Sequence, residues 1–246
     1  MRVHGVREVR EPATAGQAEE VGVCLARRGT KPRARSRAAG SGRYPLKYLV
    51  YAITLLLIAF EVWAAATGYS NFANTQIALE LIFFFVVLSY LMLKGHRLGE
   101  AIDSLGLGRR SIRARYIATG VFIFFILFVV ELAISAFSTI TNIPLPSNVE
   151  PILAQMPLYF LVLSFTLVPL CEETLFRGFL VPRAGILVSA IIFTALHFSY
   201  GSISEAVAAF VFALLAGYYF RRTGSLYTTM TAHALVNLLT VILIFS

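Results

Sequence analysis

The hydrophobic positions of this chain form long, nearly uninterrupted runs that are separated by short polar stretches. A helix needs about 20 mostly apolar residues to cross a hydrocarbon core of roughly 30 Å. Seven runs approach this length, and glycine, proline and asparagine between them are typical of loops. The expected spans are residues 46–66, 77–93, 116–140, 152–180, 184–198, 206–220 and 226–245. The pattern predicts an all-α fold, a polytopic transmembrane helix bundle of about seven spans.

Composition points to the same class of protein. Of the 246 residues, 58% are hydrophobic and 14% are charged, too few charges to cover the surface of a soluble domain. The net charge of +8 is concentrated in residues 1–43, which hold ten of the 21 Lys and Arg. We therefore expect no nucleic-acid partner, and interpret residues 1–43 as a disordered basic N-terminal tail before a transmembrane domain at 44–246. The tail could be a basic arm on anionic lipid or a dispensable extension.

Positive charges outside the tail lie on one side of the predicted bundle when the spans alternate in direction. The loops on the other side, residues 68–76, 141–151 and 199–205, contain no Lys or Arg. The charges on the first side are Lys47, Lys94, Arg97, Arg109, Arg110, Arg113, Arg115, Arg183, Arg221 and Arg222. The positive-inside rule then predicts a cytoplasmic N-terminus, in a multi-pass protein of the plasma membrane of a prokaryote.

The fourth run contains two adjacent carboxylates and an arginine, which are costly at bilayer depth and indicate function. Glu173 and Arg177 are four residues apart, so they share a helix face in the favourable order for an ion pair. Glu172 is turned about 100° away from that face and lacks this partner. This arrangement predicts a structural Glu173–Arg177 pair and leaves Glu172 for chemistry.

The other carboxylates in the hydrophobic runs are weaker indications of function. Glu61, Glu80 and Glu205 lie toward the outer ends of their predicted helices, where we expect them to reach water. Glu131 lies deeper, and the sequence assigns it no role.

Two further pairs at a spacing of four follow in the last spans: Phe193 with His197, and His233 with Asn237. At about 1.5 Å per residue, Glu172 lies roughly 12 Å from the cytoplasmic end of its helix and His197 roughly 20 Å. By the same measure His233 and Asn237 lie at roughly 10 and 17 Å. Such residues can simply hold membrane helices together. Their common depth favours a shared polar cavity instead.

The three motifs, Glu172-Glu173-x-x-x-Arg177, Phe193-x-x-x-His197 and His233-x-x-x-Asn237, resemble those of the CPBP intramembrane metalloproteases. That family includes type II CAAX prenyl endopeptidases and the bacteriocin-processing or immunity proteins formerly called Abi. The resemblance covers about residues 151–245, the expected catalytic core. It implies an intramembrane endopeptidase that cleaves a membrane-associated or lipidated peptide, such as a prenylated CAAX peptide, within the lipid bilayer.

The resemblance and the positions of the residues suggest similar roles. Glu172 would be the general base that activates water, and His197 would position that water. His233 and Asn237 would face the developing oxyanion. Supporting roles in shaping the cavity would belong to Glu173, Arg177 and Phe193.

A metal is a separate question. Glu172, His197 and His233 could supply the two-histidine, one-carboxylate set of a catalytic Zn²⁺ with an open position for water. The chain has no His-Glu-x-x-His helix, and a metal-free glutamate mechanism fits the same residues.

Two functions without proteolysis use the same fold. The protein could be a membrane binding or immunity protein that sequesters a bacteriocin-like peptide in the cavity. It could also be a proton-coupled carrier that uses Glu131, Glu172 and Glu173, although no inverted repeat is visible. The sequence does not identify the substrate.

Overall fold

The chain divides into two units, Met1–Arg43 and Tyr44–Ser246. The computed structural model describes residues 47–67, 72–145, 149–198 and 201–246, all in the second unit. The predicted tail, residues 1–43, lies outside the described residues. Within the described ranges the fold is entirely helical, as predicted.

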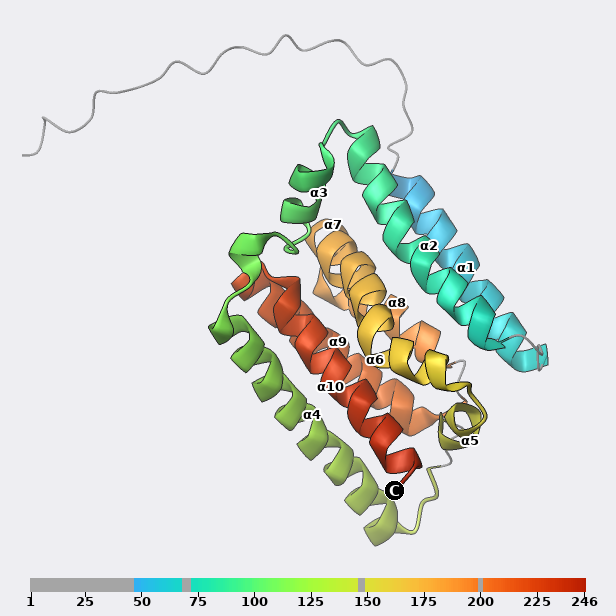
Figure 1. Ribbon diagram of the computed structural model, residues 1–246. Coiled ribbons are helices and arrows are strands. Elements are labelled where there is room, and N and C mark those ends of the chain that lie inside the picture. Colours follow the sequence, from blue (N-terminus) through green and yellow to red (C-terminus); the bar gives the residue numbers. More distant parts are fainter. Residues whose placement is uncertain (1–46, 68–71, 146–148, 199–200) are drawn as a thin grey trace, which may run out of the picture. The chain divides into compact units, whose positions relative to one another are not determined.

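Ten α-helices, one short 3-10 turn and one π-helical segment make up the described part of the chain (Figure 1). The four short ones are α3 (Leu98–Ser104), η1 (Arg109–Ser111), α5 (Val149–Ala154) and α7 (Val181–Ala184). The π-helix η2 (Thr174–Leu180) joins α6 to α7 in one continuous helix. The remaining helices are α1 (Lys47–Thr67), α2 (Phe72–Leu93), α4 (Ala114–Thr141), α6 (Leu158–Glu173), α8 (Ile186–His197), α9 (Ile203–Thr223) and α10 (Leu226–Ile244).

Five of the described helices are long and apolar enough to cross a membrane, so the chain is a multi-pass membrane protein. They are Ala73–Leu93, Ala114–Thr141, Leu158–Ala184, Ile203–Thr223 and Leu226–Ile244. The other two expected spans correspond to shorter apolar helices, Tyr48–Leu57 within α1 and Ile186–His197. Twelve residues of α8 extend about 18 Å, less than the hydrocarbon thickness. The count of seven spans therefore stays a prediction.

The fourth predicted run, residues 152–180, differs from the structure at both ends. The short helix α5 ends at Ala154, and α6 begins anew at Leu158 after Pro157. Proline favours an extended preceding residue and suits a helix start, which explains the break. The helix then continues through η2 and α7 to Ala184.

The helices α1, α2, α6, α10 and α4 follow one another across the bundle, with α8 and α9 packed behind (Figure 1). The packing of α4 against α10 depends on glycine. A Cβ atom at Gly120 of α4 would lie 2.5 Å from the carbonyl oxygen of Thr228 in α10. Small residues at such contacts let membrane helices pack at short distance. This contact places α10, which carries two of the predicted site residues, against α4.

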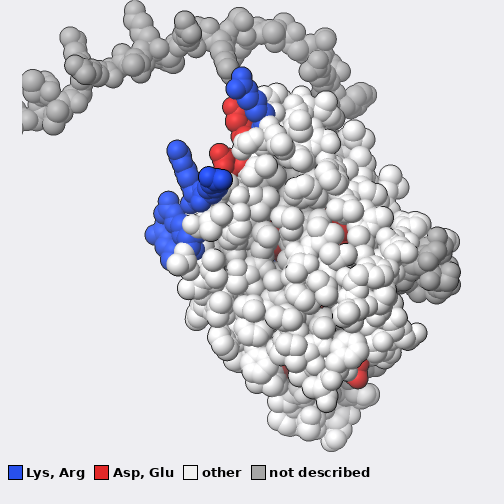
Figure 2. Space-filling view, in the orientation of Figure 1, with Lys and Arg blue, Asp and Glu red and all other residues white. Residues whose placement is uncertain are grey.

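One end of the bundle is basic, whereas the exposed side of α4 is apolar. Lys and Arg gather at one end, over α3, η1 and the start of α4 (Figure 2). Large apolar side chains are exposed along α4, among them Phe122, Phe125, Val129 and Leu132. Contiguous exposed apolar surface of this kind is what lipid contact requires. The basic end is the one that the positive-inside rule assigns to the cytoplasm, and that orientation stays a prediction.

Candidate active site

Two departures from regular α-helix flank Glu172 and Glu173. Pro169 is buried inside α6, and it removes one helical hydrogen bond and disturbs the preceding turn. The carbonyl oxygen of Ser164, five residues before Pro169, accepts a hydrogen bond from Asn237 Nδ2 on α10 at 2.7 Å. Directly after Glu173 the helix widens into the π-helix η2. Such single-turn π segments are frequent at functional sites.

Glu173 contacts two other side chains of the site, one on the next helical turn and one on α10. Its Oε1 lies 2.9 Å from Arg177 Nη1, which is the ion pair that the spacing predicted. The same oxygen lies 3.1 Å from His233 Nδ1 on α10. A carboxylate only accepts hydrogen bonds, so Nδ1 carries the hydrogen and donates it to Glu173. Glu173 therefore fixes the orientation of His233 as well as pairing with Arg177.

Arg177 is fully buried, and aromatic rings take the place of water around it. Its guanidinium carbon lies 4.4 Å from the ring centre of Phe193 and 4.7 Å from that of Phe212. Within the described residues its nitrogens have no partner besides the ion pair with Glu173. Two cation–π contacts and one ion pair thus compensate for the loss of hydration.

Glu172 faces the opposite nitrogen of the same histidine. Its Oε2 lies 3.7 Å from His233 Nε2, which is too long for a hydrogen bond. Only 6% of Glu172 is exposed, and Oε2 has no hydrogen-bond partner among the described residues. A buried polar atom without a protein partner requires a hydrogen bond from a water or a ligand. Glu172 and His233 are therefore placed to contact one small polar molecule.

His197 and Asn237 are each held by a backbone carbonyl. His197 Nδ1 lies 3.0 Å from the carbonyl oxygen of Phe193, and the two rings are 4.5 Å apart. Phe193 thus packs against His197. The bond from Asn237 to Ser164 uses one of two amide hydrogens, so the second remains for another acceptor.

All four predicted catalytic residues line one cavity of about 560 Å³. Glu172 comes from α6, His197 from α8, and His233 and Asn237 from α10. These four side chains thus meet in one cavity, as their common depth predicted. Their catalytic roles stay predictions.

The proposed metal ligands do not form a set in this structure. Among the described residues, no group of three His, Cys, Asp or Glu side chains is arranged to hold a metal ion. His233 already directs its Nδ1 at Glu173 and its Nε2 toward Glu172, and His197 directs Nδ1 at a backbone carbonyl. Contacts of this kind at Nδ1 are also typical of metal-bound histidines, so the zinc set of Glu172, His197 and His233 stays a prediction.

Several residues of the site were not found from the sequence. Phe212 packs on both Arg177 and His233, whose ring centre is 5.0 Å away, and nothing in its apolar helix distinguishes it. Glu131 and Glu205 line the cavity, although Glu205 was expected only to reach water.

The expectation for Glu80 was wrong, because this side chain is fully buried and accepts a hydrogen bond from Gln76 at 3.3 Å. Helix α2 packs against α6, so this face of α2 meets protein and not water. The side chain of Glu61 lies outside the described residues.

Comparison with known proteins found a family match in the region that contains the site. Residues 154–239 match the family model described as type II CAAX prenyl endopeptidase Rce1-like, and this stretch contains all three motifs. No curated protein and no solved structure matches the chain. The match supports the family predicted from the motifs, the CPBP family that includes the type II CAAX prenyl endopeptidases.

Proposed function

We propose that the protein is an intramembrane endopeptidase in which Glu172 acts as the general base toward a water molecule. The observation that carries this proposal is the Glu172 carboxylate itself. It is buried, lines the cavity, and has one oxygen without a hydrogen-bond partner among the described residues. A carboxylate at bilayer depth with an oxygen that accepts no hydrogen bond from the described residues is costly, so a chemical role is the simplest reason for it.

In the proposed reaction, Glu172 takes a proton from water while the water oxygen bonds to the carbonyl carbon of a peptide. The oxyanion that develops faces the second amide hydrogen of Asn237 and Nε2 of His233, which donates there as an imidazolium because its other hydrogen is on Nδ1. The carbon–nitrogen bond then breaks, and Glu172 returns the proton to the leaving amine, which regenerates the carboxylate. His197 positions the water from α8. This is the metal-free glutamate mechanism, in which no step passes through a metal.

Glu173 and Arg177 act on this reaction through His233. Since Glu173 Oε1 holds Nδ1, the ring presents Nε2 toward Glu172 in a fixed orientation. Fixing a donor before the reaction avoids reorganisation as charge develops. Glu173 is therefore a positioning residue.

The proposed substrate is a membrane-associated peptide, of the prenylated CAAX type that the family name describes. The cavity lies among helices long and apolar enough to span a membrane, so a substrate held in the bilayer reaches it by lateral diffusion. We place the protein in the plasma membrane of a prokaryote, with the basic end of Figure 2 on the cytoplasmic side.

The experiment compares new protein N-termini in cells that express wild type, Glu172→Gln or Glu100→Gln at matched levels. Glu100→Gln is the control, because it makes the same chemical change on the exposed helix α3. Termini that appear with wild type and the control but not with Glu172→Gln support the protease and identify its substrates. Equal termini in all three, with each protein inserted, contradict the proposal and favour a binding or immunity protein.

A further inference from the structure

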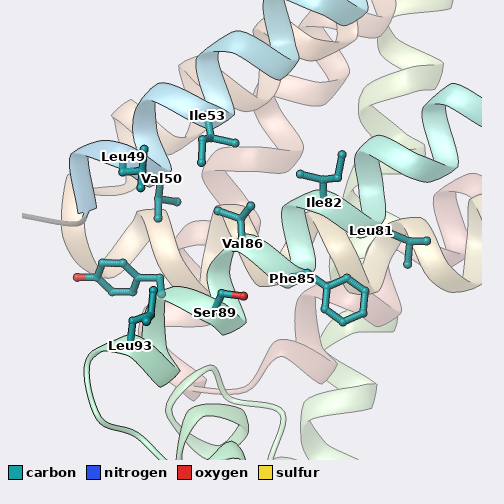
Figure 3. Close-up of a pocket in the computed structure, with 10 residues that line it drawn as sticks. Leu49, Val50, Ile53, Leu81, Ile82, Phe85, Val86, Ser89 and Leu93 are labelled. Atoms are coloured by element: carbon teal, nitrogen blue, oxygen red, sulfur yellow. The ribbon is translucent and has the colours of Figure 1, made fainter.

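A second hollow lies between α1 and α2, away from the active site (Figure 3). It has a volume of about 370 Å³ and shares no lining residue with the catalytic cavity. Leu49 and Ile53 of α1 and Val86 of α2 are among its walls (Figure 3). Of the described side chains that line it, Ser89 and Tyr90 alone carry a polar atom. We refer to this hollow as the α1–α2 groove.

The α1–α2 groove has the length of one leaflet. On α2 it extends from Leu81 to Leu93, a distance of about 18 Å at 1.5 Å per residue. Half of a hydrocarbon core of roughly 30 Å is about 15 Å. Leu93 is the last residue of α2, at the end of the bundle where the basic residues gather. The groove therefore extends from that membrane surface to about the middle of the bilayer.

Aromatic and basic side chains mark the surface end of the groove. Tyr90 lines the groove, and Tyr48 and Tyr51 lie near the start of α1 with their rings 6.1 Å apart. Tyrosine is enriched at the level of lipid headgroups. Lys94 Nζ lies 5.9 Å from the ring centre of Tyr90, and the guanidinium carbon of Arg183 lies 5.4 Å from it. Two cations therefore flank the end of the groove where a headgroup would sit.

Arg183 is held in place for this contact. Its Nη1 donates a hydrogen bond to the carbonyl oxygen of Phe179 at 3.0 Å, and its guanidinium lies 4.2 Å from the centre of that ring. The side chain remains exposed, so its other nitrogens can reach a ligand. Because the side chain is already ordered, binding an anion there costs less conformational entropy than binding it to a free arginine.

We propose that the α1–α2 groove binds one acyl chain of an anionic phospholipid whose phosphate contacts Lys94 and Arg183. The groove lies between two neighbouring helices, whose axes are typically 8–10 Å apart. Another helix, about 10–12 Å across, is too wide to enter such a space, whereas a single hydrocarbon chain is not. The net charge of the headgroup complements the two cations, and a zwitterionic headgroup brings a cation of its own. This proposal does not depend on the peptidase activity.

The test places the full chain in lipid nanodiscs with equal amounts of phosphatidylglycerol and phosphatidylcholine. Native mass spectrometry then counts the lipids that the released protein retains. Wild type is expected to retain one phosphatidylglycerol with about tenfold preference over phosphatidylcholine. The variant Lys94→Gln/Arg183→Gln should lose the preference, and Val86→Trp, which fills the groove, should retain neither lipid.

The control is Arg221→Gln/Arg222→Gln, which removes the same charge at the same end, on α9 and away from the groove. It should keep the wild-type preference. Equal retention of both lipids by wild type contradicts the proposal. So does an equal loss of preference in the control, which would indicate general attraction to the basic end. If Val86→Trp dissociates a dimer without changing lipid retention, the groove contacts a second copy of the chain and the proposal is wrong.

Discussion

The two hollows of this bundle differ in what lines them. The cavity of the candidate active site contains Glu172, His197, His233 and Asn237. The α1–α2 groove is lined by apolar side chains apart from Ser89 and Tyr90, and its cations lie at the rim. Both lie among apolar helices, so hydrophobic pattern alone does not separate them. The difference lies in the charges at depth, which are costly in a membrane and therefore indicate chemistry. A hollow without them is suited to a lipid chain.

The largest effect is expected from a change at Glu172, which should abolish activity without affecting lipid binding in the α1–α2 groove. Glu172→Gln should lower kcat about 10³-fold or more, because the amide cannot accept the proton from water. The change keeps the size of the side chain, so lipid retention in the α1–α2 groove should stay at the wild-type level. Single-turnover rates with a peptide identified from the new N-termini provide the measurement. A residual rate within tenfold of wild type is incompatible with Glu172 as the base.

The next effect concerns the charges buried beside the cavity. Arg177→Met should lower the free energy of unfolding by about 3–5 kcal/mol, because Glu173 would then be a buried charge that has lost its cation. The double variant Glu173→Leu/Arg177→Met should recover most of this loss, since an apolar pair can replace a buried ion pair. Unfolding in mixed detergent micelles measures both.

Activity should behave differently from stability in the same series. The double variant should stay at least about 10²-fold less active than wild type, because His233 has lost the acceptor at Nδ1 that orients it. Full recovery of kcat together with stability would show that Glu173 is structural only, as its ion pair alone suggested.

A smaller effect is expected at Asn237. Asn237→Ala should lower kcat about 10²-fold with little change in KM, because an oxyanion donor acts mainly in the transition state. Thr240→Val is the matched control on the same helix: its hydroxyl also lines the cavity but donates to the carbonyl of Val236. A rise in KM at unchanged kcat in Asn237→Ala would assign this residue to substrate binding.

The smallest effect is expected from metal removal. Excess chelator should change the rate of the purified protein by less than about twofold, since the described residues form no three-ligand metal group. Elemental analysis of the same sample should find less than stoichiometric zinc. Loss of activity on chelation, with recovery on adding Zn²⁺, would show that the site rearranges around a metal.

The sequence predicted the axial positions of the site residues better than their lateral contacts. Depth follows from the fixed rise of a helix, so Glu172, His197, His233 and Asn237 could be placed in one layer. The ion pair of Glu173 followed from its spacing to Arg177. The contact of Glu173 with His233 could not be predicted, because helices that are apolar on all sides give little information on which faces meet.

Local departures from regular helix were also hard to predict. The break before α6 has a signal in Pro157, which the long apolar run masked. The π-helical segment after Glu173 has no sequence signal that we can identify. Phe212 became part of the site only through the packing of α9 against α8 and η2.

The most direct test of the account is hydrolysis in H₂¹⁸O by the purified, reconstituted protein. A substrate peptide found from the new N-termini is incubated with wild type and with Glu172→Gln, and the new carboxyl group is analysed by mass spectrometry. The account predicts one ¹⁸O atom in each new C-terminal carboxylate with wild type and no cleavage with Glu172→Gln. Equal cleavage by both proteins, or peptide binding by wild type with no cleavage, would contradict it.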